Sequence, residues 1–295
     1  MDLMALADDV GTDDAVTCVG GRTQWHVGGP VASGTREVRA PAGIDAIVPE
    51  EMTVRCGAGT TVAELDGALA ERGQTVALPS WDGATVGGVL AVGRSGIRRL
   101  GYGPVRDTVL QLGVVSATGA YVKAGGPTVK NVSGYDLCRL FVGSLGTLAI
   151  LGEAILRTRP LPMASRWFSG SGVDPFELRR RLHAPTSLLW DGEITWLLLE
   201  GHPSDVEAQR RISGLDEVAG PPPFPTGGRW SLRPDEIRSL RGRFVAEIGV
   251  GVVHGENPSP QAHVDSNVEC LHRRLKSHFD PKGRLNPGRD PLAVR

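Results

Sequence analysis

Glycine-rich segments at four places in the chain carry the residue types from which an anion-binding site could be built. They span residues 20–23, 57–60, 83–96 and 125–147. Backbone amides presented by successive residues of a tight turn form a concave nest that binds anions such as phosphate. Each segment alone is better explained as a hairpin turn. Together they could hold a long anionic cofactor, although the net charge of the chain is only −1.

The segment from Lys130 to Leu148 has the most unusual pattern of the four. Gly134, Gly143 and Gly146 are too closely spaced for a helix, because each costs about 1 kcal/mol relative to alanine in a helix interior. Glycine weakens a strand as well. This density therefore indicates backbone that comes close to a flat or bulky group.

Other signatures of catalysis or metal binding are missing from the sequence. There is no G-x-G-x-x-G fingerprint, P-loop, H-E-x-x-H or G-x-S-x-G motif. The four cysteines form no C-x-x-C pair, which argues against zinc ribbons, simple iron–sulfur motifs and thioredoxin-type chemistry. We expect them to be the reduced thiols of a cytoplasmic protein. The seven histidines are dispersed, so no metal site is expected.

The composition is that of a soluble globular protein. The chain has 295 residues, of which 40% are hydrophobic and 22% charged, and this length suits two domains or one large α/β unit. No apolar run approaches the ~20 residues that span a membrane. Acidic residues near the N-terminus argue against a signal peptide. The balanced charge and the lack of a basic stripe predict no nucleic-acid partner.

Helices and strands must position the glycine-rich segments. The sequence contains local signals for the type or the ends of several of these helices and strands. Thr61 and Glu64 form a capping box for a helix that ends near Gly73. Residues 108–116 and 120–124 are typical of a hairpin. The residues from 84 to 96 are expected to form a loop.

After Pro160-Leu161-Pro162 the sequence has fewer glycine pairs and more arginine and tryptophan. This change of composition predicts a domain boundary at these prolines. Asp174, followed by Pro175, predicts a helix start. Residues 244–254 are expected to form one long strand or a pair of strands. Residues 260–279 are expected to form a final helix with one apolar face.

Eight short segments of the chain form a recognisable set, namely Gly20-Gly21-Arg22-Thr23, Ala58-Gly59-Thr60, Thr85-Val86-Gly87-Gly88, Ser95-Gly96, Arg106-Asp107, Lys130 to Asp136, Gly143 to Leu148 and Phe279 to Arg289. Each motif is weak alone, but their common order makes the pattern specific. In that order they resemble the motifs of the FAD-binding domain of the vanillyl-alcohol oxidase/p-cresol methylhydroxylase (PCMH) flavoprotein family. Within the family they are most similar to the FAD-binding subunits of glycolate oxidases.

The resemblance implies an α+β protein with a two-subdomain FAD-binding fold of PCMH type and a small α+β cap domain. The FAD-binding domain would span residues 1–160 and the short cap, which normally supplies the substrate site, residues 161–242. Residues 243–295 would form a strand, a helix and a tail that return to the FAD domain. Two features depart from the family, because the cap is short and few residues precede the first glycine loop.

The resemblance also implies roles for the glycine-rich segments. The amides of residues 20–23 and 85–88 would hold the diphosphate, residues 95–96 and 130–147 would line the ribityl chain and isoalloxazine, and the tail would approach the flavin. A donor such as Lys130 or Arg284 could stabilise the reduced flavin; Lys130 could instead be a surface cation, and Tyr135 a packed core residue. The expected cofactor-binding residues are Gly20, Gly21, Arg22, Thr23, Thr85, Gly87, Gly88, Ser95, Gly96, Lys130, Asn131, Gly134, Tyr135, Gly143, Gly146, Arg284 and Asn286.

Covalent flavin attachment in this family uses a histidine or cysteine in the first loop. Here position 22 is arginine and His26 lies past the loop, so non-covalent FAD is expected, with Cys18 just before the loop as the alternative. His254 is the best candidate for a catalytic general base. The alternative is a buried histidine with satisfied hydrogen bonds. No second histidine accompanies it to form a metal site.

The resemblance implies an FAD-dependent oxidoreductase, or a component of one, that oxidises a 2-hydroxy acid such as glycolate and passes the electrons to a partner. Its partners would include a catalytic flavoprotein homologue and an iron–sulfur electron acceptor. It would lie in the cytoplasm, or at a membrane through those partners. The alternative is an FAD-binding or structural subunit without turnover of its own, which supports a catalytic homologue. An autonomous oxidase and a nicotinamide-linked reductase also stay open.

Overall fold

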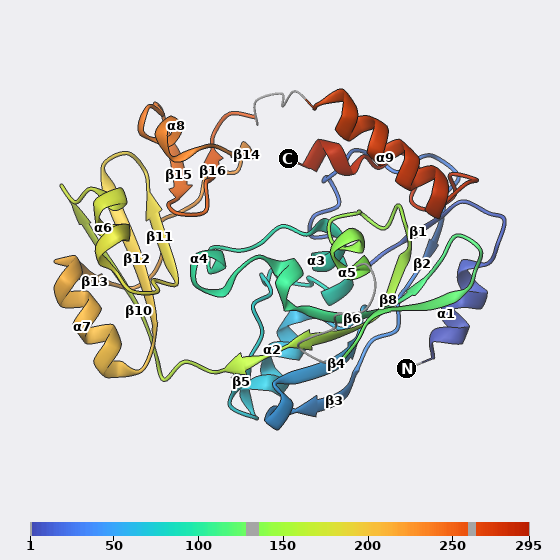
Figure 1. Ribbon diagram of the computed structural model, residues 1–295, viewed down its shortest axis with the longest axis horizontal. Coiled ribbons are helices and arrows are strands. Elements are labelled where there is room, and N and C mark those ends of the chain that lie inside the picture. The colour runs from blue at the N-terminus through green and yellow to red at the C-terminus, as the bar shows by residue number, and fades with distance from the viewer. Residues whose placement is uncertain (1, 128–135, 259–263, 295) are drawn as a thin grey trace. The chain divides into compact units, whose positions relative to one another are not determined.

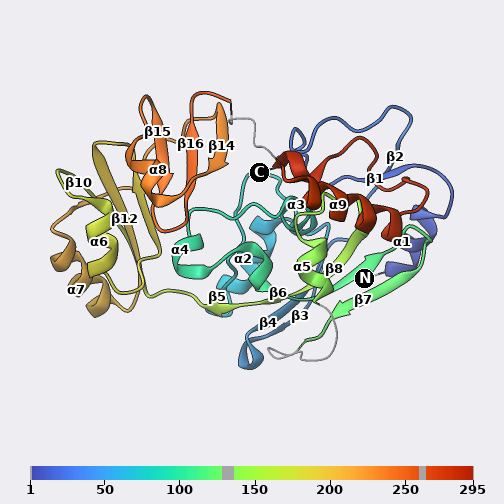
Figure 2. The ribbon, with the colours of Figure 1, turned by 45° about the horizontal axis from the view of Figure 1, so that its top comes forward.

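The chain divides into two compact units, each of which mixes helices and sheets (Figure 1 and Figure 2). The computed structural model describes residues 2–127, 136–258 and 264–294. The first unit comprises Met1–Ser95, Pro104–Leu161 and Val264–Val294, and the second comprises Gly96–Gly103 and Pro162–His263. The expected α+β class is confirmed.

A five-stranded antiparallel sheet forms the centre of the first unit, in the order β3-β4-β8-β6-β7. The register pairs Val54 with Leu156 and Cys56 with Ala154, so these side chains share one face. That face carries most of the buried apolar residues of the unit. The strands are β3 (Ile44–Val48), β4 (Thr53–Gly57), β6 (Val109–Val115), β7 (Tyr121–Gly125) and β8 (Ile150–Arg157).

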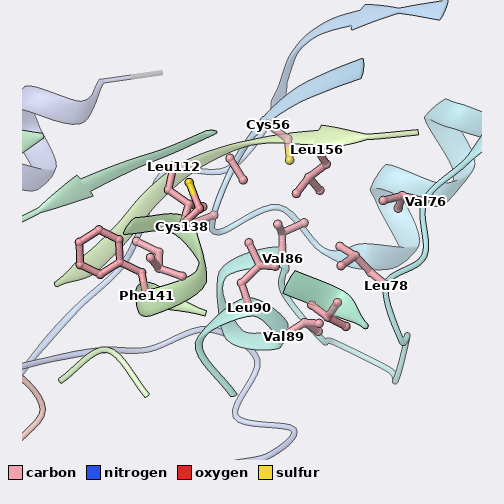
Figure 3. Close-up of a cluster of buried hydrophobic side chains, with 14 of the residues drawn as sticks. Cys56, Val76, Leu78, Val86, Val89, Leu90, Leu112, Cys138, Phe141 and Leu156 are labelled. Atoms are coloured by element: carbon pink, nitrogen blue, oxygen red, sulfur yellow. The ribbon is translucent and has the colours of Figure 1, made fainter. Parts of the chain in front are cut away.

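Three helices, α2 (Val62–Ala70), α3 (Val86–Val92) and α5 (Leu137–Phe141), pack on this apolar face. The predicted helix start at Thr61 is confirmed, because its hydroxyl accepts the Glu64 amide at 3.1 Å. Figure 3 shows side chains of α3 and α5 converging with those of the sheet.

Helix α3 lies within residues 84–96, where a loop was expected, so that prediction was wrong for residues 86–92. The helix buries Val86, Val89 and Leu90 in the core (Figure 3). Each such side chain contributes roughly 1.5–3 kcal/mol when buried, whereas each glycine in a helix costs about 1 kcal/mol. Packing therefore outweighs the low helix propensity of Gly87 and Gly88.

A second, smaller core in the first unit joins the two ends of the chain. Helix α1 (Leu3–Val10) precedes the parallel strands β1 (Val16–Cys18) and β2 (Arg36–Val38). Helix α9 (Ser266–Phe279) leads to a tail that packs Leu285 into this core. The remaining elements are the paired strands β5 (Gln74–Thr75) and β9 (Arg159–Pro160) and the 3-10 helices η1 (Pro49–Glu51), η2 (Val105–Thr108) and η3 (Pro291–Val294).

The second unit is built on a seven-stranded sheet in the order β13-β10-β12-β11-β15-β16-β14. The strands are β10 (Ala164–Ser171), β11 (Ser187–Trp190), β12 (Ile194–Gly201), β13 (Asp216–Val218), β14 (Gly228–Ser231), β15 (Phe244–Glu247) and β16 (Val252–Gly255). The helices are α4 (Arg99–Tyr102), α6 (Pro175–Arg181), α7 (Pro203–Ser213) and α8 (Pro234–Arg238). The predicted helix start at Asp174 is confirmed, because its carboxylate accepts the Phe176 amide at 2.8 Å.

Residues 243–295 are divided between the two units, whereas the sequence predicted that all of them would return to the FAD domain. Strands β15 and β16 belong to the sheet of the second unit, while α9 and the tail belong to the first. Phe244 and Ala246 of β15 and Val253 of β16 pack into the apolar core of the second unit, which holds both strands in that sheet. Among the helices that the structure describes, none has the length and apolarity to cross a membrane.

Candidate functional site

The loop of residues 20–23 follows strand β1 and presents its backbone amides without partners. Val19 N still donates to Val38 O at 2.8 Å, which anchors the start of the loop. Within the described residues, the next four amides, from Gly20 to Thr23, donate to no protein acceptor. Arg22 lies in the left-handed region with a φ of 56°. Consecutive free amides in such a turn form a donor nest that suits a phosphate.

The glycines of this loop are required by contacts within the protein. A Cβ at Gly20 would lie 2.3 Å from Thr85 Oγ1, and one at Gly21 would lie 1.7 Å from Gly83 O. The glycines therefore let loop 20–23 pack directly against the turn before α3. We expected glycine to bring backbone close to a bulky group. At these two positions the group is another loop of the protein.

The amides at the start of α3, expected to hold a diphosphate, already have protein partners. Val86 N donates to Thr60 O at 2.9 Å, Gly87 N to Ala58 O at 2.7 Å, and Gly88 N to the capping Thr85 Oγ1 at 3.2 Å. Gly87 also needs its small size, because a Cβ there would lie 2.8 Å from Ala58 Cβ. The donors for an anion therefore come from residues 20–23.

Two adjoining pockets form an elongated cleft beside this loop. They share Cys18, Gly20, Thr85, Gly88, Ala91, Leu145 and Asn286. One pocket, the loop end, adds Gly21, Arg22, Thr23, Gln24, Trp25, Val27, Val92 and Arg289. The other, the apolar end, adds Val19, Ala40, Ala58, Gly59, Gly87, Gly146, Ile150 and Leu151. The cleft thus joins amide donors and two arginines at one end to small and aliphatic residues at the other.

These residues suit a cofactor such as FAD. The free amides and the arginines provide donors and positive charge for a diphosphate. Gly59, Gly87 and Gly146 line the apolar end. A Cβ at Gly59 or Gly87 would meet Ala40 or Ala58 of the protein itself, whereas one at Gly146 would meet nothing closer than 3.8 Å. Gly146 is therefore the position where a flat ring system can come close to the backbone. Nine of the expected residues line the cleft, namely Gly20, Gly21, Arg22, Thr23, Thr85, Gly87, Gly88, Gly146 and Asn286.

Asn286 and Arg284 have different places, although both lie in the tail. The Asn286 amide group donates to Leu145 O and accepts the Thr17 hydroxyl at 2.6 Å, beside the cleft. The Arg284 side chain was expected to approach the flavin, but it is 3% exposed and lines neither pocket. Its guanidinium donates to three backbone carbonyls, including those of Asp14 at 2.8 Å and Ala117 at 3.0 Å. Arg284 therefore holds the smaller core together.

Other expected cofactor residues lie outside the cleft or outside the described residues. Ser95 Oγ accepts the Val105 amide at 3.0 Å, and Gly143 N donates to Leu90 O at 2.9 Å. Neither residue nor Gly96 lines the two pockets. The expected residues outside the described part of the chain are Lys130, Asn131, Gly134 and Tyr135.

Cys18 lies at the cleft, where a covalent flavin link was the alternative. Burial raises the pKa of its thiol from 9.0 to about 11. The thiol is therefore protonated and a poor nucleophile at neutral pH.

The second unit contains a separate polar cluster around His254. His254 on β16 and Glu247 on β15 are joined by a hydrogen bond between Nε2 and Oε1 of 2.9 Å. The Glu247 side chain is 3% exposed, and its Oε2 has no partner among the described residues. The ring of Phe224 contacts the imidazole edge-on at 4.8 Å between centroids.

Arg229 belongs to the same cluster. The register pairs Arg229 of β14 with His254, and His254 with Val245, so Arg229, His254 and Glu247 lie on one face of the sheet. Burial lowers the pKa of Arg229 and the neighbouring Arg99 adds to this, while Glu247 opposes it. No sequence motif predicted Glu247 or Arg229 as site residues. The strand register alone places them beside His254. In the part of the chain that the structure describes, no three metal-ligating side chains converge.

Comparisons with known proteins agree with the motif pattern. The profile of a family described as FAD binding domain matches residues 3–125. Glycolate oxidase subunit GlcE of Escherichia coli is 34% identical over 213 residues, which cover 68% of this chain and 60% of that protein. D-lactate dehydrogenase of Archaeoglobus fulgidus is 45% identical over 106 residues, covering 36% of this chain and 24% of that protein. The chain thus spans less than two thirds of the length of these relatives.

Solved structures show the same fold. Alkyldihydroxyacetonephosphate synthase matches with a TM-score of 0.70 at 15% identity, over 97% of this chain and 73% of that one. Berberine bridge enzyme matches with a TM-score of 0.52 at 16% identity, over 71% of this chain and 46% of that one. At such identities the likeness establishes the fold alone. Motifs, profile, relatives and fold agree that this chain carries the PCMH-type FAD-binding domain of the vanillyl-alcohol oxidase/p-cresol methylhydroxylase flavoprotein family, with FAD as its cofactor.

Proposed function

We propose that this chain is an FAD-dependent oxidoreductase component that oxidises a small 2-hydroxy acid, such as glycolate, and passes the electrons to a partner. The observation that carries the proposal is the Glu247–His254 pair beside Arg229, in a chain whose other unit has the FAD cleft. The names of two relatives, a glycolate oxidase subunit and a D-lactate dehydrogenase, support the substrate class.

The polar cluster has the groups that oxidation of a hydroxy acid requires. With Nε2–H of His254 donating its hydrogen bond to Glu247, Nδ1 is the ring nitrogen that can accept a proton from the substrate hydroxyl. The Arg229 guanidinium attracts the substrate carboxylate. FAD, when bound, supplies the acceptor for the hydride equivalent. The role of His254 is thus a general base, with Glu247 as the residue that fixes its tautomer.

Binding of FAD is proposed to be non-covalent. Arg22 occupies the loop position at which relatives in the family would carry a linking histidine or cysteine. The high pKa of the Cys18 thiol, about 11, disfavours the nearest alternative nucleophile.

A second candidate function is an FAD-binding subunit that supports a catalytic homologue and turns over no substrate. One observation favours it: within the described residues, the hydrogen-bonded partner of His254 is Glu247 alone, and no three metal-ligating side chains converge there. The relative named as a glycolate oxidase subunit suits both candidates. In either case the proposed partners are a flavoprotein homologue and an iron–sulfur electron acceptor, in the cytoplasm or at a membrane to which those partners attach.

Anaerobic reduction of the purified, FAD-loaded chain separates the candidates. Glycolate and D-lactate should each be added in the absence of any partner while the flavin absorbance at about 450 nm is followed. Bleaching by one of them supports turnover by this chain. A yellow protein that neither acid bleaches, but that dithionite does bleach, favours the supporting subunit.

A further inference from the structure

The tail carries a cation that the expected set of cofactor residues lacked. Arg289 lines the loop end of the cleft together with residues 20–23. Its Nη1 donates to the carbonyls of Trp25 at 2.5 Å and Val27 at 2.8 Å, and to that of Gly29. The guanidinium carbon lies 4.5 Å from the centre of the Trp25 ring. One side chain therefore touches three peptide groups of the loop region and also borders the cleft.

Half of the Arg289 guanidinium is still available. All three of its hydrogen bonds use Nη1, and within the described ranges no acceptor engages Nε or Nη2. No carboxylate of the described residues pairs with it, whereas Arg22 on the same indole pairs with Glu37 at 2.5 Å. The Nε–Nη2 edge of arginine is a two-donor fork that matches the oxygens of a phosphate.

We propose that Arg289 is a cofactor-binding residue whose free guanidinium edge neutralises the FAD diphosphate while Nη1 positions the amide loop. The proposal concerns how the cofactor is held, and it is independent of the reaction proposed above. Its ligand chemistry is a diphosphate, because the same end of the cleft supplies the unpaired amides of residues 20–23.

The tail and the loop are joined at further points, so cofactor binding and tail docking are coupled. Asp290 N donates to Gly28 O at 2.8 Å, and Ala32 N donates to Pro287 O at 2.9 Å. A ligand that contacts both Arg289 and the loop binds the docked tail more tightly than a released tail, so it shifts the equilibrium toward docking. FAD should therefore slow tryptic cleavage after Arg289.

The test compares FAD with riboflavin, which lacks the diphosphate. We expect Arg289→Gln in the apo-protein to weaken FAD binding by about tenfold or more and riboflavin binding by less than about threefold, because the lost bonds are charge-assisted bonds to phosphate. Arg289→Lys should fall between, since an ammonium keeps the charge but loses the fork. Lys282→Gln is the control: Lys282 lies in the same tail, pairs with Asp13 at 3.0 Å and lines neither pocket.

Three outcomes would overturn the assignment: unchanged FAD affinity in Arg289→Gln, an equal loss for FAD and riboflavin, or an equal loss in Lys282→Gln. The second would reduce Arg289 to a residue that only shapes the loop. If Arg289→Gln does not fold, as its melting curve would show, the ratio of FAD to riboflavin affinity in Arg289→Lys decides, and an unchanged ratio rejects the proposal. Tryptic release of residues 290–295, followed by mass spectrometry with and without FAD, gives a readout independent of turnover.

Discussion

Thr85 occupies the space that a side chain on Gly20 would need, because a Cβ at Gly20 would lie 2.3 Å from Thr85 Oγ1. The same hydroxyl oxygen accepts the Gly88 amide at 3.2 Å and so caps α3. One threonine thereby fixes both the start of a helix and the position of the amide loop. The candidate FAD cleft depends on this contact, because Gly20, Thr85 and Gly88 all line it.

We predict that Gly20→Ala separates the loop from α3 and weakens FAD binding. Overpacking of this kind costs about 1–3 kcal/mol of stability. Urea unfolding of the apo-protein and an FAD titration would measure the two effects. Gly67→Ala is the matched control, because a Cβ there meets nothing within 4 Å, and alanine in a helix interior should stabilise by roughly 0.5–1 kcal/mol. A Gly20→Ala protein with wild-type stability and FAD affinity would show that the contact is not restrictive.

We predict that His254→Asn retains FAD but loses reduction by the hydroxy acid. Loss of a general base lowers the rate by about 10²-fold or more, which stopped-flow absorbance of the bound flavin would measure. His183→Asn, an exposed position of the second unit, is the control. Equal reduction rates in His254→Asn and wild type would remove His254 from the mechanism. Unequal FAD affinities would show an effect on binding instead.

The thiols should differ sharply in reactivity. Burial raises the pKa of Cys18 to about 11, of Cys56 to about 12 and of Cys138 to about 11. Cys270 is exposed on α9. At pH 8, iodoacetamide should therefore label one cysteine rapidly in the folded protein, and Cys270→Ser should abolish that fast phase. Cys18 is half-buried, so its fast labelling, detected by peptide mass spectrometry, would contradict the raised pKa of its thiol.

Acid should remove a stabilising contribution from helix α7. The hydrogen bond from Arg210 is the main cause that lowers the pKa of Glu207 from 4.5 to about 2. Because the folded-state pKa is depressed, the stabilisation is complete above the ordinary pKa and is lost as the pH falls toward 2. The Tm difference between wild type and Glu207→Gln should shrink over that interval. Glu193→Gln, an exposed position without an ion pair among the described residues, should show no such trend.

Local signals in the sequence were sufficient where one short segment decides the outcome. The Thr61 cap predicted the start of α2, and the Asp174–Pro175 pair predicted the start of α6, because capping involves residues within one turn. The glycine loops were also recognisable from their order. Helix α3 was missed because its stability comes from burying Val86 and Leu90 against a distant sheet. Propensity alone cannot reveal that packing.

The sites depend on register and long-range contacts, which a single sequence does not display. The Glu247–His254–Arg229 cluster exists because β14 and β15 flank β16. Arg284 and Arg289 stand five positions apart in one tail motif, and nothing in that motif distinguishes the buried one from the one at the cleft. Their different partners, 167 residues away at Ala117 and 264 residues away at Trp25, make the distinction.

The hydrogen bond from Arg289 to Trp25 also determines when the loop can reach its final structure during synthesis of the chain. The loop leaves the ribosome 264 residues before the side chain that braces it. At roughly 5–20 residues per second, the loop waits on the order of 13–53 s for that partner. The candidate cofactor cleft is therefore among the last parts of this chain to form, and a truncated chain that ends before the tail should not retain FAD.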